Sequence, residues 1–371
     1  MLNILFYAPF SNRSRDAESV MLECRRQGHN VIFISSYESG AIHDFLRSRG
    51  IPVHVHSVTK YNRIAGIISQ IFFLIRFCRR HNIQLLFSHL ESANFISVCA
   101  GFFIRAQVII NRHHADDFIL NNWSNSWTYR FTNKMVKKCI VYSQVAKRVM
   151  IEQEGMNSSQ LIVMPLLYDF ELYNKVNHQV VQQLKAKFPN ELILTCIGRL
   201  VEMKKIPRAI YVLENLIRNG IHARLFVLGE GYLMSDLKTL VNQLGLSDQV
   251  VFLGRVENVL DYLTFADIVL HPSVSESSCV VIKEAGLTKT IPIVCDQVGD
   301  FNEYLVNNES AILVSRDNFV EGAVEFISLY LKDIGKYRHI GENLNQIILK
   351  KFSIENNFQL YDKYLNNRNE I

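Results

Sequence analysis

Short apolar runs alternate with longer amphipathic segments along most of the 371-residue chain. Many runs are apolar throughout and end at a glycine or a polar turn, which is typical of strands buried in a parallel sheet. The segments between the runs repeat their apolar positions at helical spacing. In the first half, the pattern predicts strands at 3–7, 31–35, 53–58, 85–88, 108–111, 140–143 and 162–165. It predicts helices at 18–27, 41–49 and 93–101, and one that begins at Ile64.

The second half repeats this alternation. Strands are predicted at 192–197, 224–228, 250–253, 268–271 and 293–295, with helices at 206–219, 232–244, 259–265 and 280–287. Strands that alternate with helices form parallel sheets covered on both faces, so we expect an α/β fold of two Rossmann-like, doubly wound domains.

The alternation breaks after Pro165, and we place a linker near 165–190. The N-terminal domain is expected at 1–170 and the C-terminal domain at 171–351, while a helix at about 352–371 packs back on the first domain. Ligand is expected in a central cleft that the two domains face.

Cysteine usage points to a reducing compartment. The seven cysteines form no Cys-x-x-Cys pair and no His/Cys cluster at metal-ligand spacing. This argues against a disulfide framework and a structural zinc, so we expect a cytoplasmic protein without a metal. The first residues lead straight into a strand, and we expect no secretory signal.

Charge is unevenly distributed. Residues 1–170 contain 19 Lys and Arg against 11 Asp and Glu, whereas the remainder contains 21 against 24. The basic half indicates either an anionic partner or only a solvated face. The apolar stretch 64–77, followed by Arg79 and Arg80, is too short to span a membrane. It could lie on an anionic bilayer, although a core helix with a basic end is the favoured interpretation. Because no Lys/Arg–aromatic motif for base stacking appears, no nucleic-acid partner is expected.

Two carboxylates stand around the predicted strand-to-helix junction after residue 271. Glu276 lies on the loop after the strand, and Glu284 lies on the following helix, with seven residues between the two. Ligands of open parallel sheets bind at the carboxyl ends of strands, and helix starts offer free N–H groups to phosphate. The alternative is a capped helix with two solvated acids.

A second junction carries two cations. Gly198 and Arg199 follow a strand directly, and Lys204 lies five residues after Arg199. Such a pair can clamp a diphosphate, because Arg offers planar bidentate bonds and Lys a point charge. A solvated loop is the alternative. After a third strand, Arg255 and Val256 could present backbone groups to a nucleobase, or form a plain turn.

The first half offers weaker candidates. His113 and His114 follow a strand and could hydrogen-bond a substrate hydroxyl or a phosphate, as could His89. Asn12 and Arg13 follow the first strand, where a loop that binds an acceptor or a phosphate would belong.

In series, the motifs of the second half resemble the retaining GT-B glycosyltransferases of family four. The motifs are Gly198-Arg199-Leu200 with Lys204, Gly229-Glu230-Gly231, Val251-Phe252-Leu253-Gly254, Ala266-Asp267, His271-Pro272-Ser273, Glu276-x7-Glu284-Ala285, and Val298-Gly299 with Glu303. The resemblance reaches the first half through His113 and Val141-Tyr142-Ser143.

The resemblance implies a site for a nucleotide diphosphate sugar. Arg199 and Lys204 would hold the diphosphate, Glu276 the sugar and Glu284 the ribose, while His113 or His114 approaches the sugar from the other domain. The resemblance also implies contacts to sugar and phosphate from Ser277, Ser278, Cys279 and Val280, contacts to the base from the backbone of Arg255 and Val256, and no metal or other cofactor.

The expected activity is retaining transfer of a hexosyl unit to an acceptor hydroxyl. The acceptor would be a glycan or a lipid-linked molecule of cell-envelope or surface polysaccharide synthesis, reached at an anionic membrane surface. A sugar-nucleotide epimerase and a non-catalytic binder are the alternatives. The chain departs from the family pattern at Lys205, Ser277 and Cys279, where glycines are usual, and at Leu166-Leu167, where Asn-Gly is usual.

Overall fold

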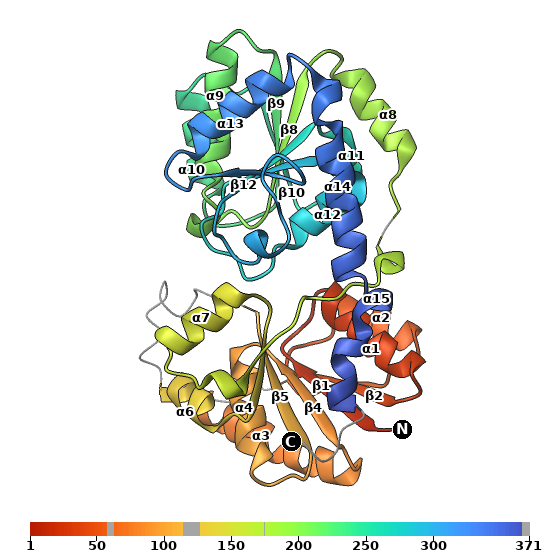
Figure 1. Cartoon of the computed structure of the whole chain (residues 1–371). Helices are drawn as coiled ribbons and strands as arrows, with labels where there is room; N and C mark the ends of the chain where they lie inside the picture. Colours follow the sequence, from red (N-terminus) through yellow and green to blue (C-terminus); the bar gives the residue numbers. More distant parts are fainter. Residues whose placement is uncertain (58–62, 114–126, 174, 366–371) are drawn as a thin grey trace. The chain divides into compact units, whose positions relative to one another are not determined.

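The computed structural model describes residues 1–57, 63–113, 127–173 and 175–365 and divides the chain into two compact units. The first unit contains Met1–Leu172 and the segment that begins at Phe352, and the second contains Tyr173–Lys351 (Figure 1). Each unit has its own parallel sheet, as the alternating pattern predicted.

The first sheet has seven strands in the order β3-β2-β1-β4-β5-β6-β7. All its neighbouring strands pair in parallel. The chain starts at the centre of the sheet, runs to one edge and then returns to build the other side, so the direction of winding changes between β1 and β4. The strands are β1 Asn3–Ala8, β2 Asn30–Ser35, β3 Val53–Val55, β4 Leu85–His89, β5 Gln107–Arg112, β6 Lys138–Val141 and β7 Leu161–Val163.

Helices flank this sheet on both sides (Figure 1). α1 packs beside α15, whereas α3 packs beside α4 and α4 beside α6. This separation follows from right-handed crossovers on either side of the change in winding. The helices are α1 Arg15–Arg26, α2 Ala41–Ser48, α3 Arg63–Arg80, α4 Glu91–Gly101, α6 Trp127–Met135, α7 Gln144–Glu152 and α15 Ile354–Asn357.

α3 packs one face into the core of the first unit. Leu74, Phe77 and Cys78 are buried there with Leu5 and Leu86 of the sheet. The interpretation of this segment as a core helix is therefore confirmed for one face. The opposite face exposes large apolar side chains, which are considered below.

The expected single helix at 352–371 is wrong for the residues that the structure describes. α15 is followed by a 3-10 turn, η6 Phe358–Tyr361, and by the short helix α16 Asp362–Leu365. Tyr361 lies against Phe87 of β4 with ring centroids 6.0 Å apart, so side-chain packing holds this segment on the first unit.

The second sheet has six strands in the order β10-β9-β8-β11-β12-β13. Its winding changes direction between β8 and β11, which pair in parallel. The strands are β8 Leu192–Ile197, β9 Ala223–Leu228, β10 Val250–Gly254, β11 Ile268–His271, β12 Ile291–Cys295 and β13 Ile312–Val314. The helices are α8 His178–Lys187, α9 Ile206–Arg218, α10 Met234–Gln243, α11 Val259–Phe265, α12 Val280–Thr288, α13 Phe319–Tyr330 and α14 Ile334–Phe352.

The linker is shorter than the expected 165–190, because α8 already belongs to the second unit. Asn177 begins this helix: its side chain accepts hydrogen bonds from the backbone N–H groups of Gln179 and Val180. An asparagine in this position satisfies amides that a helix start leaves unpaired.

Candidate functional site

The strongest candidate residues lie on the loops that follow β8 and β11, where the winding of the second sheet changes direction. The loop after β8 carries Gly198 and Arg199 and continues into η4 Glu202–Lys204, and the loop after the neighbouring β11 carries Glu276. Crevices of this kind bind ligands in open α/β sheets. The structure therefore brings the two predicted junctions to one sheet edge.

Glu276 is held by two basic side chains. Lys204 Nζ and His271 Nε2 both contact its Oε1, the histidine at 2.7 Å. The side chain of Glu276 is only 10% exposed, and that of Lys204 is 14% exposed. His271 appears in the family motif, but we expected no chemical role for it.

The electrostatics of this group favour charged partners. Burial opposes ionisation of Glu276, but the hydrogen bond and charge of His271, with those of Lys204, hold its pKa well below the usual range. Burial also opposes the charged form of His271 and by itself lowers its pKa. The neighbouring Cys279 and Glu276 outweigh the effect of burial and raise the pKa of His271 to about 9. A carboxylate held ionised in this way can accept hydrogen bonds from the hydroxyl groups of a ligand.

Arg199 stays open to solvent. It is exposed, and within the described part of the chain its guanidinium makes no hydrogen bond or ion pair. Among the described residues, the guanidinium of Arg199 therefore has no ionic or hydrogen-bonding partner, whereas Lys204 contacts the carboxylate of Glu276.

Backbone geometry around η4 explains one departure from the family pattern. Lys205 adopts a left-handed conformation, with φ +47°, between η4 and α9. Glycine adopts this conformation without steric cost, whereas a lysine adopts it at some cost in energy. The turn is therefore retained although the glycine is replaced.

Gly229, at the end of β9, allows close packing of two strand-end loops. A Cβ atom at this position would lie 1.9 Å from the carbonyl oxygen of Gly198. Any side chain there would push the β8 loop, and Arg199 with it, out of place.

The other predicted donor contacts lie on the same unit. Ser277 and Ser278 are half-buried in the loop that leads into α12, and Cys279 is the buried N-cap residue of that helix. The Cys279 side chain does not cap the helix, but its Sγ lies 3.4 Å from His271 Nε2. Val280 is exposed at the first helical position, and Glu284 is half-buried one turn later.

A buried ion pair beside this loop was missed. Lys283 Nζ lies 2.7 Å from Asp300 Oδ2, and both side chains are almost fully buried. The one signal in the sequence is a lysine within the apolar stretch that begins α12. Its partner lies 17 residues away on another segment, and neither the pairing nor the burial can be read from the chain.

Three potential metal ligands also meet here. His271 Nε2, Glu276 Oε1 and Cys279 Sγ lie within 4.8 Å of one another. Imidazole, carboxylate and thiolate are zinc ligands, but the ammonium of Lys204 contacts the same glutamate oxygen and would oppose a cation. The absence of a metal remains a prediction for this site.

In the first unit, His113 follows β5 and is half-buried. Its Nε2 lies 2.9 Å from Nδ1 of His89, the last residue of β4. Burial and the neighbouring His113 hold the pKa of His89 well below its usual value, so His89 is neutral and helps to fix the orientation of His113.

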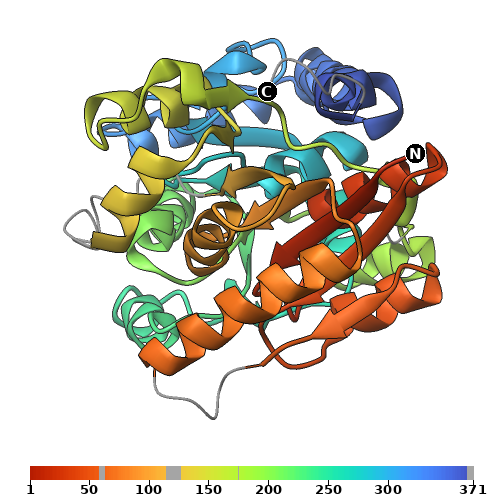
Figure 2. The same cartoon turned by 90° about the horizontal axis from the view of Figure 1, so that it is seen from below.

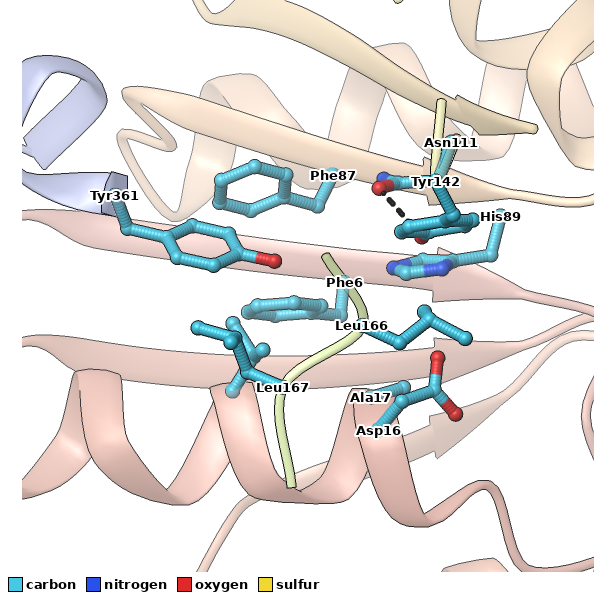
Figure 3. A pocket seen from close by; sticks show the side chains of 11 residues that line it. Phe6, Asp16, Ala17, Phe87, His89, Asn111, Tyr142, Leu166, Leu167 and Tyr361 are labelled. Carbon is cyan, nitrogen blue, oxygen red and sulfur yellow. Dashed lines mark hydrogen bonds between the residues drawn. The ribbon is translucent and has the colours of Figure 1, made fainter. Parts of the chain in front are cut away.

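Figure 3 shows His89 with Asn111 and Tyr142 around a small cavity near the carboxyl ends of β4, β5 and β6. Tyr142 donates a hydrogen bond to Asn111 Oδ1 at 3.0 Å. Leu166 and Leu167 lie along the cavity, so the pair that replaces Asn-Gly fills space with apolar side chains. With about 10 Å³, the cavity is far too small for a sugar.

The remaining candidates lie on other loops. Arg13 forms an ion pair with buried Glu18 at 2.7 Å and stacks on Phe45 at 3.6 Å, so its guanidinium fixes the start of α1. Asn12 is exposed beside it, and His114 lies outside the described residues. In the second unit, Arg255 is exposed and Val256 half-buried directly after β10.

Comparison with known proteins identifies the family of both halves. A model described as Glycosyltransferase Family 4 matches residues 17–172, and one described as Glycosyl transferases group 1 matches residues 180–346. N-acetyl-alpha-D-glucosaminyl L-malate synthase of Bacillus anthracis is 22% identical over 356 residues, 91% of this chain and 88% of that protein.

Solved structures share the fold. Anabaena Alr3699/HepE in complex with UDP-glucose superposes with a TM-score of 0.83 at 18% identity, covering 98% of this chain and 99% of that one. WaaG, a glycosyltransferase involved in lipopolysaccharide biosynthesis, gives 0.69 at 14% identity, with coverage of 93% and 95%.

Two parallel-sheet units, the ordered series of motifs and these matches lead to one conclusion: the chain belongs to the group 1 glycosyltransferases with the GT-B fold, as a divergent member.

Proposed function

We propose that this glycosyltransferase moves a hexosyl unit from a nucleotide diphosphate sugar to an acceptor hydroxyl, with retention of anomeric configuration and without a metal. The observation that carries the proposal is the group of Arg199, Lys204 and ionised Glu276 at one sheet edge. Solved relatives bound to UDP and UDP-glucose support a donor of this chemical class.

In this proposal, Arg199 and Lys204 bind the diphosphate, and Glu276 binds sugar hydroxyls while His271 remains its partner. Backbone N–H groups at the start of α12 add hydrogen bonds to the leaving phosphate. The bond from the anomeric carbon to the phosphate oxygen breaks, and the bond to the acceptor oxygen forms on the same face. The acceptor proton passes to the departing phosphate, and protein cations replace a metal in stabilising its charge.

We also propose a glycan or lipid-linked acceptor of envelope or surface polysaccharide synthesis, reached at an anionic membrane surface. The solvent face of α3 supports this. Ile64, Ile68 and Phe72, which lie on one side of the helix, are 73%, 48% and 69% exposed. Figure 2 shows α3 along the outside of the first unit.

The residues next to this face are basic. Arg76, Arg79 and Arg80 are exposed at the end of α3, and Arg79 donates to the carbonyl oxygen of Phe103, itself 59% exposed. α3 contains no acidic residue. Apolar side chains beside arginines suit the interface of an anionic bilayer. In the described part of the chain, no helix is long and apolar enough to cross a membrane.

A transfer assay tests the proposed activity. Purified protein is incubated with UDP-hexoses and a lipid extract that contains glycan acceptors, and the product linkage is determined by NMR. We expect a product whose anomeric configuration matches the donor. An inverted product would contradict retention, and conversion of a donor to a new sugar isomer without acceptor would replace transfer by epimerisation.

A further inference from the structure

The Lys283–Asp300 pair is unusual for its position. Lys283 is fully buried within the first four residues of α12, where the helix dipole disfavours a cation. Moving an ammonium from water into the protein interior costs roughly several kcal/mol. A close counter-charge and hydrogen bonds can compensate this cost. Asp300 supplies that charge, and the ring of Tyr304 lies 4.8 Å from the ammonium. Replacement of a buried ion pair by well-packed apolar residues is often neutral or stabilising, so a contribution to stability is a weak explanation for the pair.

Ser278 connects the pair to the donor loop. Its hydroxyl donates to Asp300 Oδ2 at 2.6 Å and accepts from Lys283 Nζ at 2.9 Å. Three side chains from the loop, α12 and the segment after β12 are thus joined by three mutual hydrogen bonds. Ser278 stands two residues after Glu276 and directly before the N-cap of α12, so the set fixes the stretch between them.

The segment that carries Asp300 also supports Glu276 directly. A Cβ atom at Gly299 would lie 2.8 Å from the carbonyl oxygen and 2.9 Å from the Cβ of Glu276. Gly299 has φ +54°, which favours glycine, and the two backbones are therefore in close contact. The side chain of Glu276 is thus held by Lys204 and His271, and its backbone is in close contact with this segment.

We infer that Lys283, Asp300 and the Ser278 hydroxyl are positioning residues that hold Glu276 in the geometry the donor sugar requires. The inference rests on the proposed function. The diphosphate is assigned mainly to the separate loop after β8, so a loosened β11 loop should impair recognition of the sugar far more than recognition of the nucleotide.

Ser278→Ala is the cleanest test, because it removes the link and leaves the buried ion pair and the Ser278 amide in place. We expect its affinity for UDP to stay within about twofold of wild type. Its affinity for the preferred UDP-sugar should fall by about tenfold to a hundredfold, the range typical of one hydrogen bond to a charged group. Ser278→Thr, which keeps the hydroxyl, should restore sugar recognition. Ser328→Ala, which removes a hydroxyl bonded within α13 at 2.8 Å, is the matched control and should bind both ligands normally.

A second variant tests the pair itself. Lys283→Met with Asp300→Asn removes both charges together, which avoids leaving one buried charge alone. We expect a folded protein with the same selective loss of UDP-sugar affinity. Equal losses of UDP and UDP-sugar affinity, or unchanged UDP-sugar affinity in both variants, would overturn the inference. Wild-type protein that binds no nucleoside diphosphate would contradict the proposed function, and the inference with it.

Discussion

His271 Nε2 lies 2.7 Å from Glu276 Oε1, so the carboxylate assigned to the donor sugar is fixed by the last residue of the strand that precedes it. Lys204 reaches the same oxygen from the neighbouring loop. If a bound diphosphate draws Lys204 away, we expect Glu276 to keep its contact with His271, which would preserve the charge and direction of the carboxylate.

The imidazolium form of His271 should contribute to stability in a defined pH range. Its pKa of about 9 in the folded protein exceeds the value of 6.5 for a free histidine. Its contribution is therefore complete below about pH 6.5 and is lost as the pH rises through 9. Thermal unfolding of wild type and His271→Gln between pH 6 and 10 checks this, because the difference in Tm should shrink towards high pH. A difference that grows with pH would contradict the assignment.

His89 should show the opposite dependence. Its pKa in the folded protein lies well below 6.5 because of burial and the neighbouring His113. The contribution of neutral His89 to the free energy of unfolding is present above pH 6.5 and is lost as the pH falls. Below that pH the histidine of the unfolded chain binds a proton, and this favours unfolding. We expect His89→Asn, which keeps a polar atom near Nδ1, to be less sensitive to acid than wild type. Urea unfolding at pH 5 and pH 7 measures the effect, and equal acid sensitivity would contradict it.

Removal of the Arg199 guanidinium should impair catalysis strongly. Arg199→Ala is expected to lower kcat/KM by roughly a hundredfold, the loss typical of one group that stabilises charge in a transition state. Lys205→Ala, which removes a cation one residue beyond Lys204, is the control and should cost far less. Steady-state kinetics compare the two, and similar losses would indicate that general positive charge rather than placement matters.

Chelators should leave the activity intact. The ammonium of Lys204 contacts the same oxygen of Glu276 as His271 does, and its charge would oppose a metal bound by His271, Glu276 and Cys279. Incubation with EDTA followed by a transfer assay in metal-free buffer should give full activity, and purified protein should contain no stoichiometric zinc by elemental analysis. Activity that EDTA abolishes and zinc restores would show that these three residues hold a catalytic metal.

The exposed face of α3 should determine membrane association. Ile68→Ser with Phe72→Ser is expected to reduce flotation with vesicles that contain anionic lipid, while Tyr37→Ser, an exposed aromatic of the same unit, should not. Arg76→Gln with Arg80→Gln should weaken the binding free energy by about 1 kcal/mol for each arginine. The remaining binding should also be less sensitive to salt. Equal flotation of all variants would place the contact elsewhere.

Much of the fold could be predicted because the spacing of apolar residues differs between strands and helices. The alternation identified both parallel sheets, and glycines and polar turns marked the ends of most strands. The start of α8 was missed, because its capping residue Asn177 follows an irregular stretch and the helix has a weakly apolar face. The C-terminal segment was predicted as one helix, because the breaks within it depend on packing such as that of Tyr361 against Phe87.

The candidate site could be predicted only where residues follow neighbouring strands and so share one sheet edge. Arg199, Lys204 and Glu276 follow adjacent strands, and their meeting follows from the topology of a parallel sheet. The Lys283–Asp300 pair could not be predicted, because it joins a helix to a distant loop through buried charges. The role of His271 depends on its distance from Glu276, which no spacing reveals.

A crystal structure with a bound nucleoside diphosphate sugar tests the central claim most directly. We predict that Arg199 and Lys204 contact the diphosphate, and that Glu276, still bonded to His271, accepts a hydrogen bond from the sugar. A donor bound elsewhere, or a Lys204 that remains on Glu276 while the diphosphate lies beyond its reach, would contradict the account.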